Sequence, residues 1–261
     1  MSRVMELTAA PGGIGWLRFL MPAKRNPFSL AFVAELTEAL ATAARRDDIR
    51  VLIITGGEHF CCGGDLKEFR STFLSGARAS LDLMDAVNGA ALAAHGFPKP
   101  SIAAVRGAAF GAGMSLAMSA DLVVAAESAR FCQAFIRIGG CPDTGSSWLL
   151  QRRVGPAMAR KLVLTGREID GRAAAAIGLS DETVPDDRVE ETALALAREI
   201  AAHSMFALTV AKKVLREAAG AGFAEALDIE ARAQALLAQG HDFPEALAAF
   251  AEKRPAAVRD R

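Results

Sequence analysis

Three short, continuous apolar runs constrain the fold of this chain more than any other feature of its sequence. They read VLIIT at residues 51–55, SIAAV at 101–105 and DLVVA at 121–125. Runs of this kind are typical of strands that are buried on both faces of a parallel sheet. Helical patterns lie between and around them, at residues 66–73, along a longer helix at 83–92, and at 114–120. The alternation predicts an α/β fold with mostly parallel strand pairing.

The rest of the chain extends this pattern and then changes character. An earlier strand is predicted at residues 14–21, followed by a helix that Ser29 caps and that continues to Arg45. After Gly145 the strand pattern fades, and we expect helices at residues 146–151, 157–164, 171–177, 189–203, 208–219 and 223–239. A composition shift near residue 200, without a linker, predicts an α/β core at residues 1–200 and a helical C-terminal subdomain at 201–261.

Charge and cysteine usage exclude several classes of protein. Lys plus Arg and Asp plus Glu number 30 each, so the chain lacks the basic excess of a nucleic-acid-binding protein. Cys61 and Cys62 are adjacent, a poor arrangement for disulfides, which favours a reducing compartment. With no leader pattern and no long uninterrupted apolar run, we expect a soluble cytoplasmic protein with no membrane partner. The four histidines have no metal-ligand spacing, and we expect no metal.

Two glycine-rich turns each follow a predicted strand and open a helix. They are CGGDL at residues 62–66 and GAAFGAG at residues 107–113. Small residues let a ligand approach the backbone, and the first N–H groups of a helix have no partner within it. Two such groups that converge on one oxygen form an oxyanion hole. Either turn alone could equally be glycine-rich for packing, and neither matches a phosphate-binding loop, which disfavours a nucleotide fold.

Four ordered segments of the chain resemble the crotonase (enoyl-CoA hydratase/isomerase) family. They are KRNPFS at residues 24–29, HFCCGGDLKE at 59–68, the second glycine turn with its helix and D-L-V strand at 105–123, and residues 154–179. The resemblance covers nearly the whole chain. It implies a crotonase-like spiral of ββα units with a helical C-terminal region, assembled as a homotrimer or hexamer. It also implies an acyl-CoA thioester as partner, with coenzyme A as part of the substrate and no separate cofactor.

By position, the resemblance assigns the oxyanion hole to the N–H groups of Gly64 and Ala112. The family usually has glycine at the second position; alanine supplies the same N–H where its φ is allowed. These donors would stabilise the oxygen of the enolate that forms when a thioester loses its α-proton. The two glutamates that hydratases of the family use to split water fall on Ser115 and Phe135. Neither is a carboxylate, which argues against ordinary syn-hydration of an enoyl-CoA.

Asp143, in the segment GGCPDTG, is the acidic residue that could replace them. It matches the position of the catalytic aspartate in isomerase-type members of the family. Its neighbours Ile138, Cys141 and Trp148 predict an apolar setting that raises the carboxyl pKa. From the residues alone, an aspartate here is more often the cap of a helix that begins near Gly145; with the resemblance, catalysis is favoured.

Other positions follow the resemblance with less chemistry behind them. Lys24 and Arg25 would lie near the CoA phosphates, although a solvated basic pair is an equal alternative. The first turn would contribute Cys62, Asp65 and Leu66 to substrate binding. Phe135 and Trp148 would line the acyl pocket or simply belong to the core. Asn88 stands where the family's dehalogenase has a water-activating histidine, which argues against hydrolytic dehalogenation.

The sequence therefore predicts an enzyme, an acyl-CoA double-bond isomerase. In this interpretation Asp143 moves a proton across a dienolate that the amides of Gly64 and Ala112 hold. Two alternatives stay open: a hydratase or lyase that acts on an unusual acyl-CoA, and a catalytically silent CoA-binding homologue with a structural role. The acyl group itself is not predicted.

Overall fold

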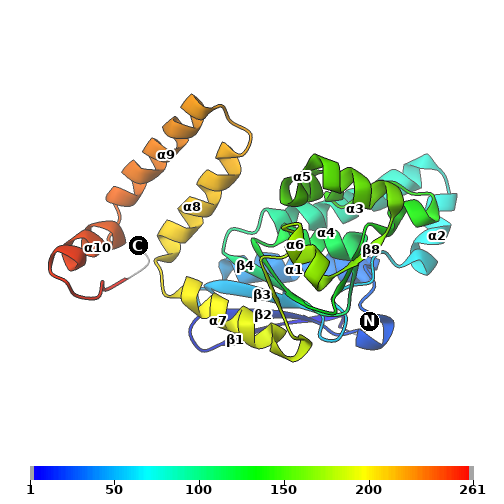
Figure 1. The fold of residues 1–261 in the computed structure, drawn as a ribbon, viewed down its shortest axis with the longest axis horizontal. Coiled ribbons are helices and arrows are strands. Elements are labelled where there is room, and N and C mark those ends of the chain that lie inside the picture. The colour runs from blue at the N-terminus through cyan, green and yellow to red at the C-terminus, as the bar shows by residue number, and fades with distance from the viewer. Residues whose placement is uncertain (1–2, 259–261) are drawn as a thin grey trace.

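A six-stranded, mostly parallel sheet forms the centre of the protein (Figure 1). The structure, a computed structural model, describes residues 3–258. In sheet order the strands are β1 (Met5–Ala10), β2 (Ile14–Phe19), β3 (Val51–Thr55), β4 (Ser101–Val105), β6 (Leu122–Ala126) and β9 (Glu182–Val184). The hairpin β1–β2 is antiparallel and every other neighbouring pair is parallel. The predicted α/β class is confirmed.

Helices cover the sheet and explain its apolar strands. All residues of β3 and β4 are buried, because helices pack against them. Contacts run from α7 (Val189–Ala201) to β2, β3, β4 and β6, and from α4 (Ala112–Ser119) to β4 and β6. Every residue of α4 is buried, so this helix fixes the centre of the molecule.

A second, three-stranded sheet lies beside the first and departs from the sequence prediction. It contains β5 (Ala108–Phe110), β7 (Arg130–Cys132) and β8 (Glu168–Asp170). The second glycine turn is therefore not a plain loop, since β5 lies inside it. The expectation that strands end near Gly145 is also wrong, because β8 and β9 follow that residue. Strands of three residues are too short to show a period.

The helices of the core mostly begin and end where the sequence predicts. They are α1 (Leu30–Arg45), α2 (Leu66–Leu74), α3 (Ala77–His95), α5 (Ser146–Thr165) and α6 (Gly171–Ala176), with 3-10 turns at Pro22–Lys24, Ala134–Ile138 and Asp186–Arg188. Ser29 caps α1 as expected. Its hydroxyl oxygen accepts a hydrogen bond from the Phe32 N–H at 3.1 Å. The two helices expected at residues 146–151 and 157–164 are joined in α5, which breaks at Gly155 before Pro156.

Three C-terminal helices form an arm that stands apart from the sheet (Figure 1). They are α8 (Met205–Ala218), α9 (Phe223–Ala238) and α10 (Asp242–Ala251), of which α10 was not expected from the sequence. Lys212 on α8 attaches the arm through hydrogen bonds to the Asp121 carboxylate, at 2.5 Å, and to the Lys99 carbonyl, at 2.8 Å. The division of the chain at residue 200 stays a prediction.

Among residues 3–258, no single helix has the length and apolar composition to cross a bilayer. Asp186–Ala201 and Met205–Ala218 meet those two criteria only when taken together, across a bend of 104°.

Candidate active site

The two glycine turns lie side by side because the segment after β3 pairs with β5. The Cys61 N–H donates to the Ala108 carbonyl at 2.9 Å, and the Phe110 N–H donates to the Cys61 carbonyl at 3.0 Å. A Cβ atom on Gly113 would lie 2.2 Å from the Cys61 carbonyl oxygen, so the two segments leave no room for a side chain there. The pairing holds both turns together beyond the carboxyl-terminal ends of β3 and β4.

The backbone amides of Gly64 and Ala112 are unused in these adjacent turns. Within the described part of the chain, neither N–H donates a hydrogen bond, although the flanking Gly63 carbonyl and Asp65 N–H both bond to Phe28. Ala112 is the first residue of α4, where an N–H has no partner in the helix. Gly111 carries the unusual conformation, with φ 50° and ψ −119°, so Ala112 keeps an allowed backbone. Two adjacent, unpaired amides are the elements of an oxyanion hole.

The Asp143 carboxyl does not cap α5. The cap residue is Gly145, with no side-chain hydrogen bond, so the capping alternative is wrong. Instead the carboxylate accepts a hydrogen bond from the Thr144 hydroxyl at 2.5 Å. Burial raises the pKa of Asp143, and the Thr144 hydrogen bond opposes the shift. A half-buried carboxyl group with a raised pKa holds its proton more tightly than an exposed aspartate does.

The predicted source of that burial is only partly correct. Ile138 and Trp148 are 60% and 44% exposed, and Cys141 is exposed as well. The segment around Asp143 is instead positioned by a buried pair of side chains that the sequence does not indicate. The Ser146 hydroxyl donates to the Gln133 amide oxygen at 2.6 Å, and the Gln133 amide nitrogen lies 3.2 Å from the Met114 sulfur. This chain of contacts fixes the start of α5 against α4.

Ser115 and Phe135 supply no acid or base. The Ser115 hydroxyl is fully buried and donates to the Gly111 carbonyl at 3.2 Å. The Phe135 ring covers Gly111, since a Cβ atom on that glycine would lie 3.5 Å from the ring. An aromatic ring therefore lies against the residue that precedes the Ala112 amide.

Residues of the first turn are arranged around its backbone. The Cys62 N–H donates to the Arg25 carbonyl at 2.9 Å, and the Cys62 sulfur lies 3.7 Å from the Lys24 carbonyl. Both basic side chains are exposed beside the turn. Asp65 caps α2 by accepting from the N–H groups of Lys67 and Glu68, so its carboxylate already has a structural role. Leu66, on α2, is 50% exposed.

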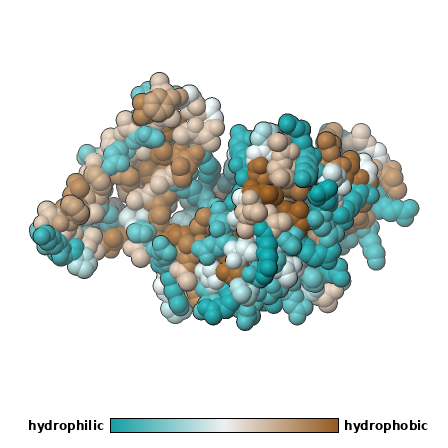
Figure 2. All heavy atoms as spheres, in the orientation of Figure 1, coloured by the Kyte–Doolittle hydropathy of each residue, from teal (hydrophilic) through white to brown (hydrophobic). Residues whose placement is uncertain are grey.

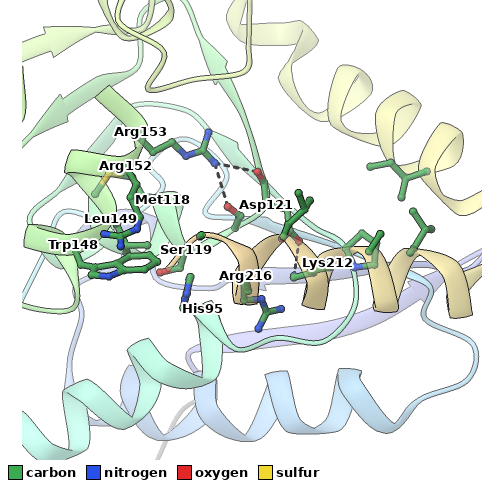
Figure 3. A pocket seen from close by; sticks show the side chains of 17 residues that line it. His95, Met118, Ser119, Asp121, Trp148, Leu149, Arg152, Arg153, Lys212 and Arg216 are labelled. Atoms are coloured by element: carbon green, nitrogen blue, oxygen red, sulfur yellow. Dashed lines mark hydrogen bonds and ion pairs between the residues drawn. The ribbon is translucent and has the colours of Figure 1, made fainter. Parts of the chain in front are cut away.

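Two adjoining pockets lie near the start of α5, and among their described lining residues are neither Asp143 nor the amide positions Gly64 and Ala112. The inner pocket, of about 440 Å³, lies between α3, α4 and the start of α5, and Thr144 forms part of its wall. The outer pocket, of about 530 Å³, lies between the core and α8 (Figure 3). Both include His95, Ser119, Trp148 and Leu149. Among residues 3–258, no group of three His, Cys, Asp or Glu side chains could hold a metal ion.

Comparison with known proteins identifies the family. A family model described as enoyl-CoA hydratase/isomerase matches residues 9–261. The chain belongs to the enoyl-CoA hydratase/isomerase family. Two relatives from Escherichia coli (strain K12) are 1,2-epoxyphenylacetyl-CoA isomerase, 36% identical with 93% of each chain covered, and 2,3-dehydroadipyl-CoA hydratase, 39% identical with 89% of this chain and 90% of the relative covered. The crystal structure of an enoyl-CoA hydratase from Polaromonas sp. JS666 matches with TM-score 0.92 and 30% identity, over 98% of this chain and 99% of the other.

The family assignment confirms the predicted crotonase fold, and the protein is an enzyme of this family. Members of the enoyl-CoA hydratase/isomerase family act on acyl-CoA thioesters. Trp148, which the sequence suggests for the acyl pocket, lines both pockets, whereas Phe135 lines neither. Leu92 and His95 were not predicted as pocket residues. Asn88, Leu92 and His95 lie on one face of α3, and their spacing of four and then three residues is the signal that could have identified that face.

Proposed function

We propose that this enzyme moves a double bond along an acyl-CoA by a 1,3-proton shift. The thioester oxygen accepts hydrogen bonds from the N–H groups of Gly64 and Ala112. The Asp143 carboxylate removes a proton from one carbon and returns it to the carbon two bonds away. The observation that carries the proposal is a half-buried carboxyl group that caps no helix and whose pKa burial raises.

The proton balance needs no second carboxylate. Loss of the proton places negative charge on the thioester oxygen as a dienolate, and Asp143 becomes a carboxylic acid. Return of the proton restores the carboxylate and completes the isomerisation. Amide donors that are already in place stabilise the charged intermediate more than the neutral thioester, which lowers the barrier. A raised pKa makes the carboxylate a stronger base, so its pKa differs less from that of the weakly acidic C–H group. The smaller difference favours proton transfer.

A hydratase or lyase is the second candidate function. It is supported by the 39% identity to a relative named 2,3-dehydroadipyl-CoA hydratase, whereas the 36% identical 1,2-epoxyphenylacetyl-CoA isomerase supports the first. Hydration would require Asp143 alone to hold and split a water molecule, because Ser115 and Phe135 cannot ionise as carboxylates. We therefore favour isomerisation.

The enzyme is expected to convert a 3-enoyl-CoA to the 2-enoyl-CoA without uptake of oxygen from the solvent. The conversion is followed by chromatography of the thioesters, in water labelled with heavy oxygen. Labelled 3-hydroxyacyl-CoA formed from a 2-enoyl-CoA, with no isomerisation, would establish a hydratase instead. Tight acyl-CoA binding with no turnover across a broad panel of thioesters would favour a silent homologue.

We also propose that the C-terminal arm mediates assembly into a homotrimer or hexamer. Figure 2 shows apolar side chains gathered over the arm, and Phe223 and Phe250 are 81% and 85% exposed. A monomer rarely exposes apolar surface of this kind without a partner. Coenzyme A would enter only as part of the substrate, with Lys24 and Arg25 near its phosphates.

Replacing Phe250 by aspartate is expected to lower the oligomer mass, because a charge would be buried in the contact. Light scattering after size exclusion measures the mass of the wild type and of F250D. Glu252→Gln, on an exposed residue next to the end of α10, is the control and should leave the mass unchanged. A wild-type protein that is monomeric at working concentrations would contradict the assembly proposal.

A further inference from the structure

The outer pocket carries more positive charge than its surroundings neutralise. Four basic side chains line it, and Asp121 is the one acid among the described lining residues; the basic residues are Arg152, Arg153, Lys212 and Arg216. Lys212 pairs with Asp121 at 2.5 Å, and Arg153 pairs with Asp181 at 2.7 Å. Within residues 3–258, Arg152 and Arg216 form no ion pair with a carboxylate. Two cations in this wall are therefore left for a ligand.

These two arginines are held in place by other contacts. The Arg152 guanidinium lies over the Trp148 ring, 3.5 Å from its centroid. One nitrogen of Arg216 donates to the Phe97 carbonyl at 2.9 Å, which fixes the side chain. Within residues 3–258 its other N–H groups donate no hydrogen bond. An arginine fixed in this way is well suited to hydrogen-bond a carboxylate.

His95 lies beside the Trp148 ring and is exposed to the same excess of positive charge. Its ring is 5.1 Å from the Trp148 ring, and Figure 3 shows it on the side of the pocket toward Arg216. Burial lowers the pKa of His95, and the charges of Arg216, Lys212 and Arg152 lower it further, against the opposite effect of Asp121. An anion bound here would offset that positive potential.

The two adjoining pockets lie between Thr144, the neighbour of Asp143, and these cations. Thr144, whose hydroxyl donates to Asp143, lines the inner pocket together with apolar side chains, His95 and Trp148. These two residues also line the outer pocket. Ser119, at the far end of α4, lies about 10 Å along the helix axis from Ala112. An extended acyl chain of medium length spans such a distance.

We infer that the preferred substrate is an acyl-CoA whose chain ends in a carboxylate, which binds to Arg216 and Arg152. The inference rests on the proposed function, because it takes the thioester to lie at Gly64 and Ala112. The apolar inner pocket holds the methylene groups, and the outer pocket receives the charged end. The substrate class is thus the mono-CoA thioester of a medium-chain dicarboxylic acid.

The kinetic test compares two substrates that differ only at the chain end. These are 3-decenoyl-CoA and the CoA thioester of 3-decenedioic acid. In both, the double bond occupies the same position relative to the thioester carbonyl. We expect kcat/KM to be at least about tenfold higher for the diacid thioester, since a charged hydrogen bond forms only with it. Arg216→Gln and Arg152→Gln should each raise the KM for the diacid thioester about tenfold or more. The KM for 3-decenoyl-CoA should stay the same in both variants. Lys213→Gln removes a charge from the exposed side of α8 and is the matched control.

A binding test on the unaltered protein does not depend on any variant folding. The pKa of His95 is measured by NMR with saturating sebacyl-CoA or with decanoyl-CoA, which lacks the terminal carboxylate. We expect sebacyl-CoA to raise the His95 pKa and decanoyl-CoA to leave it unchanged or lower it by further burial.

The outcomes separate this inference from the proposed function. Equal kcat/KM values for the two substrates, with an unchanged His95 pKa, would overturn the carboxylate site and leave the isomerase proposal standing. No turnover of either substrate, together with a raised His95 pKa in sebacyl-CoA, would overturn the isomerase proposal and support the carboxylate site.

Discussion

Replacing Asp143 by asparagine is expected to lower the isomerase kcat by about a hundred- to ten-thousandfold, the usual contribution of a positioned acid–base group. The amide has the shape of the carboxyl group but cannot accept and return a proton. Because the Asp143 side chain caps no helix, the fold should survive the change. Steady-state rates with a 3-enoyl-CoA measure the loss, and thermal unfolding monitored by circular dichroism checks the fold.

The stability of the Asp143→Asn variant at neutral pH provides the control. Burial raises the pKa of Asp143 above its ordinary value of 3.8, so the folded state binds this proton more readily than the unfolded state. Its contribution to stability is complete below the unfolded pKa and is lost as pH rises through the folded pKa. At neutral pH the variant should therefore unfold at the same or a higher temperature than the wild type. Wild-type activity should fall as acid protonates the base. Full activity of D143N would exclude the proton-transfer role.

Replacing Ala112 by proline is expected to lower kcat by about a hundred- to a thousandfold, the cost of losing one oxyanion donor. Proline has no N–H, and its fixed φ suits the first position of a helix, which Ala112 occupies in α4. The variant therefore removes a main-chain donor with little change to the helix. Turnover of the 3-enoyl-CoA and the unfolding temperature are measured together.

Ala112→Gly is the matched control for the proline variant. Glycine keeps the N–H and also follows Gly111 without strain, so activity should stay within a few fold of the wild type. Equal loss in both variants would show that the effect arises from packing of α4. Retained activity in A112P would place the thioester oxygen elsewhere.

The sequence predicts the fold best where a residue pattern is long or one-sided. The apolar runs of β3 and β4 are correct to the residue, because strands covered on both faces need uninterrupted apolar side chains. The short strands β5, β7, β8 and β9 were not predicted, since their pairing depends on segments distant in the chain. The ion pair of Lys212 and Asp121 is a contact of the same kind and leaves no local trace.

For the candidate site, the sequence identifies positions but not contacts. The glycine turns identify Gly64 and Ala112 as candidate donors, because a main-chain N–H is supplied whatever the side chain; their role stays a prediction. The role of Asp143 could not be decided, because a capping aspartate and a buried one have the same local sequence. The two unneutralised arginines were not predicted, since Arg152 and Arg216 meet only when α8 packs near α5.

In both turns the position that cannot vary is the glycine before the donor. Gly63 has φ 94° and Gly111 φ 50°, and a Cβ atom on Gly63 would lie 2.9 Å from the Phe110 carbonyl oxygen. A Cβ atom on Gly64 would only touch the Phe69 ring at 3.5 Å, and Ala112 already carries one. The side chains at positions 64 and 112 can therefore vary while both positions keep a main-chain N–H. Mutational tolerance at residues 64 and 112 should exceed that at 63 and 111.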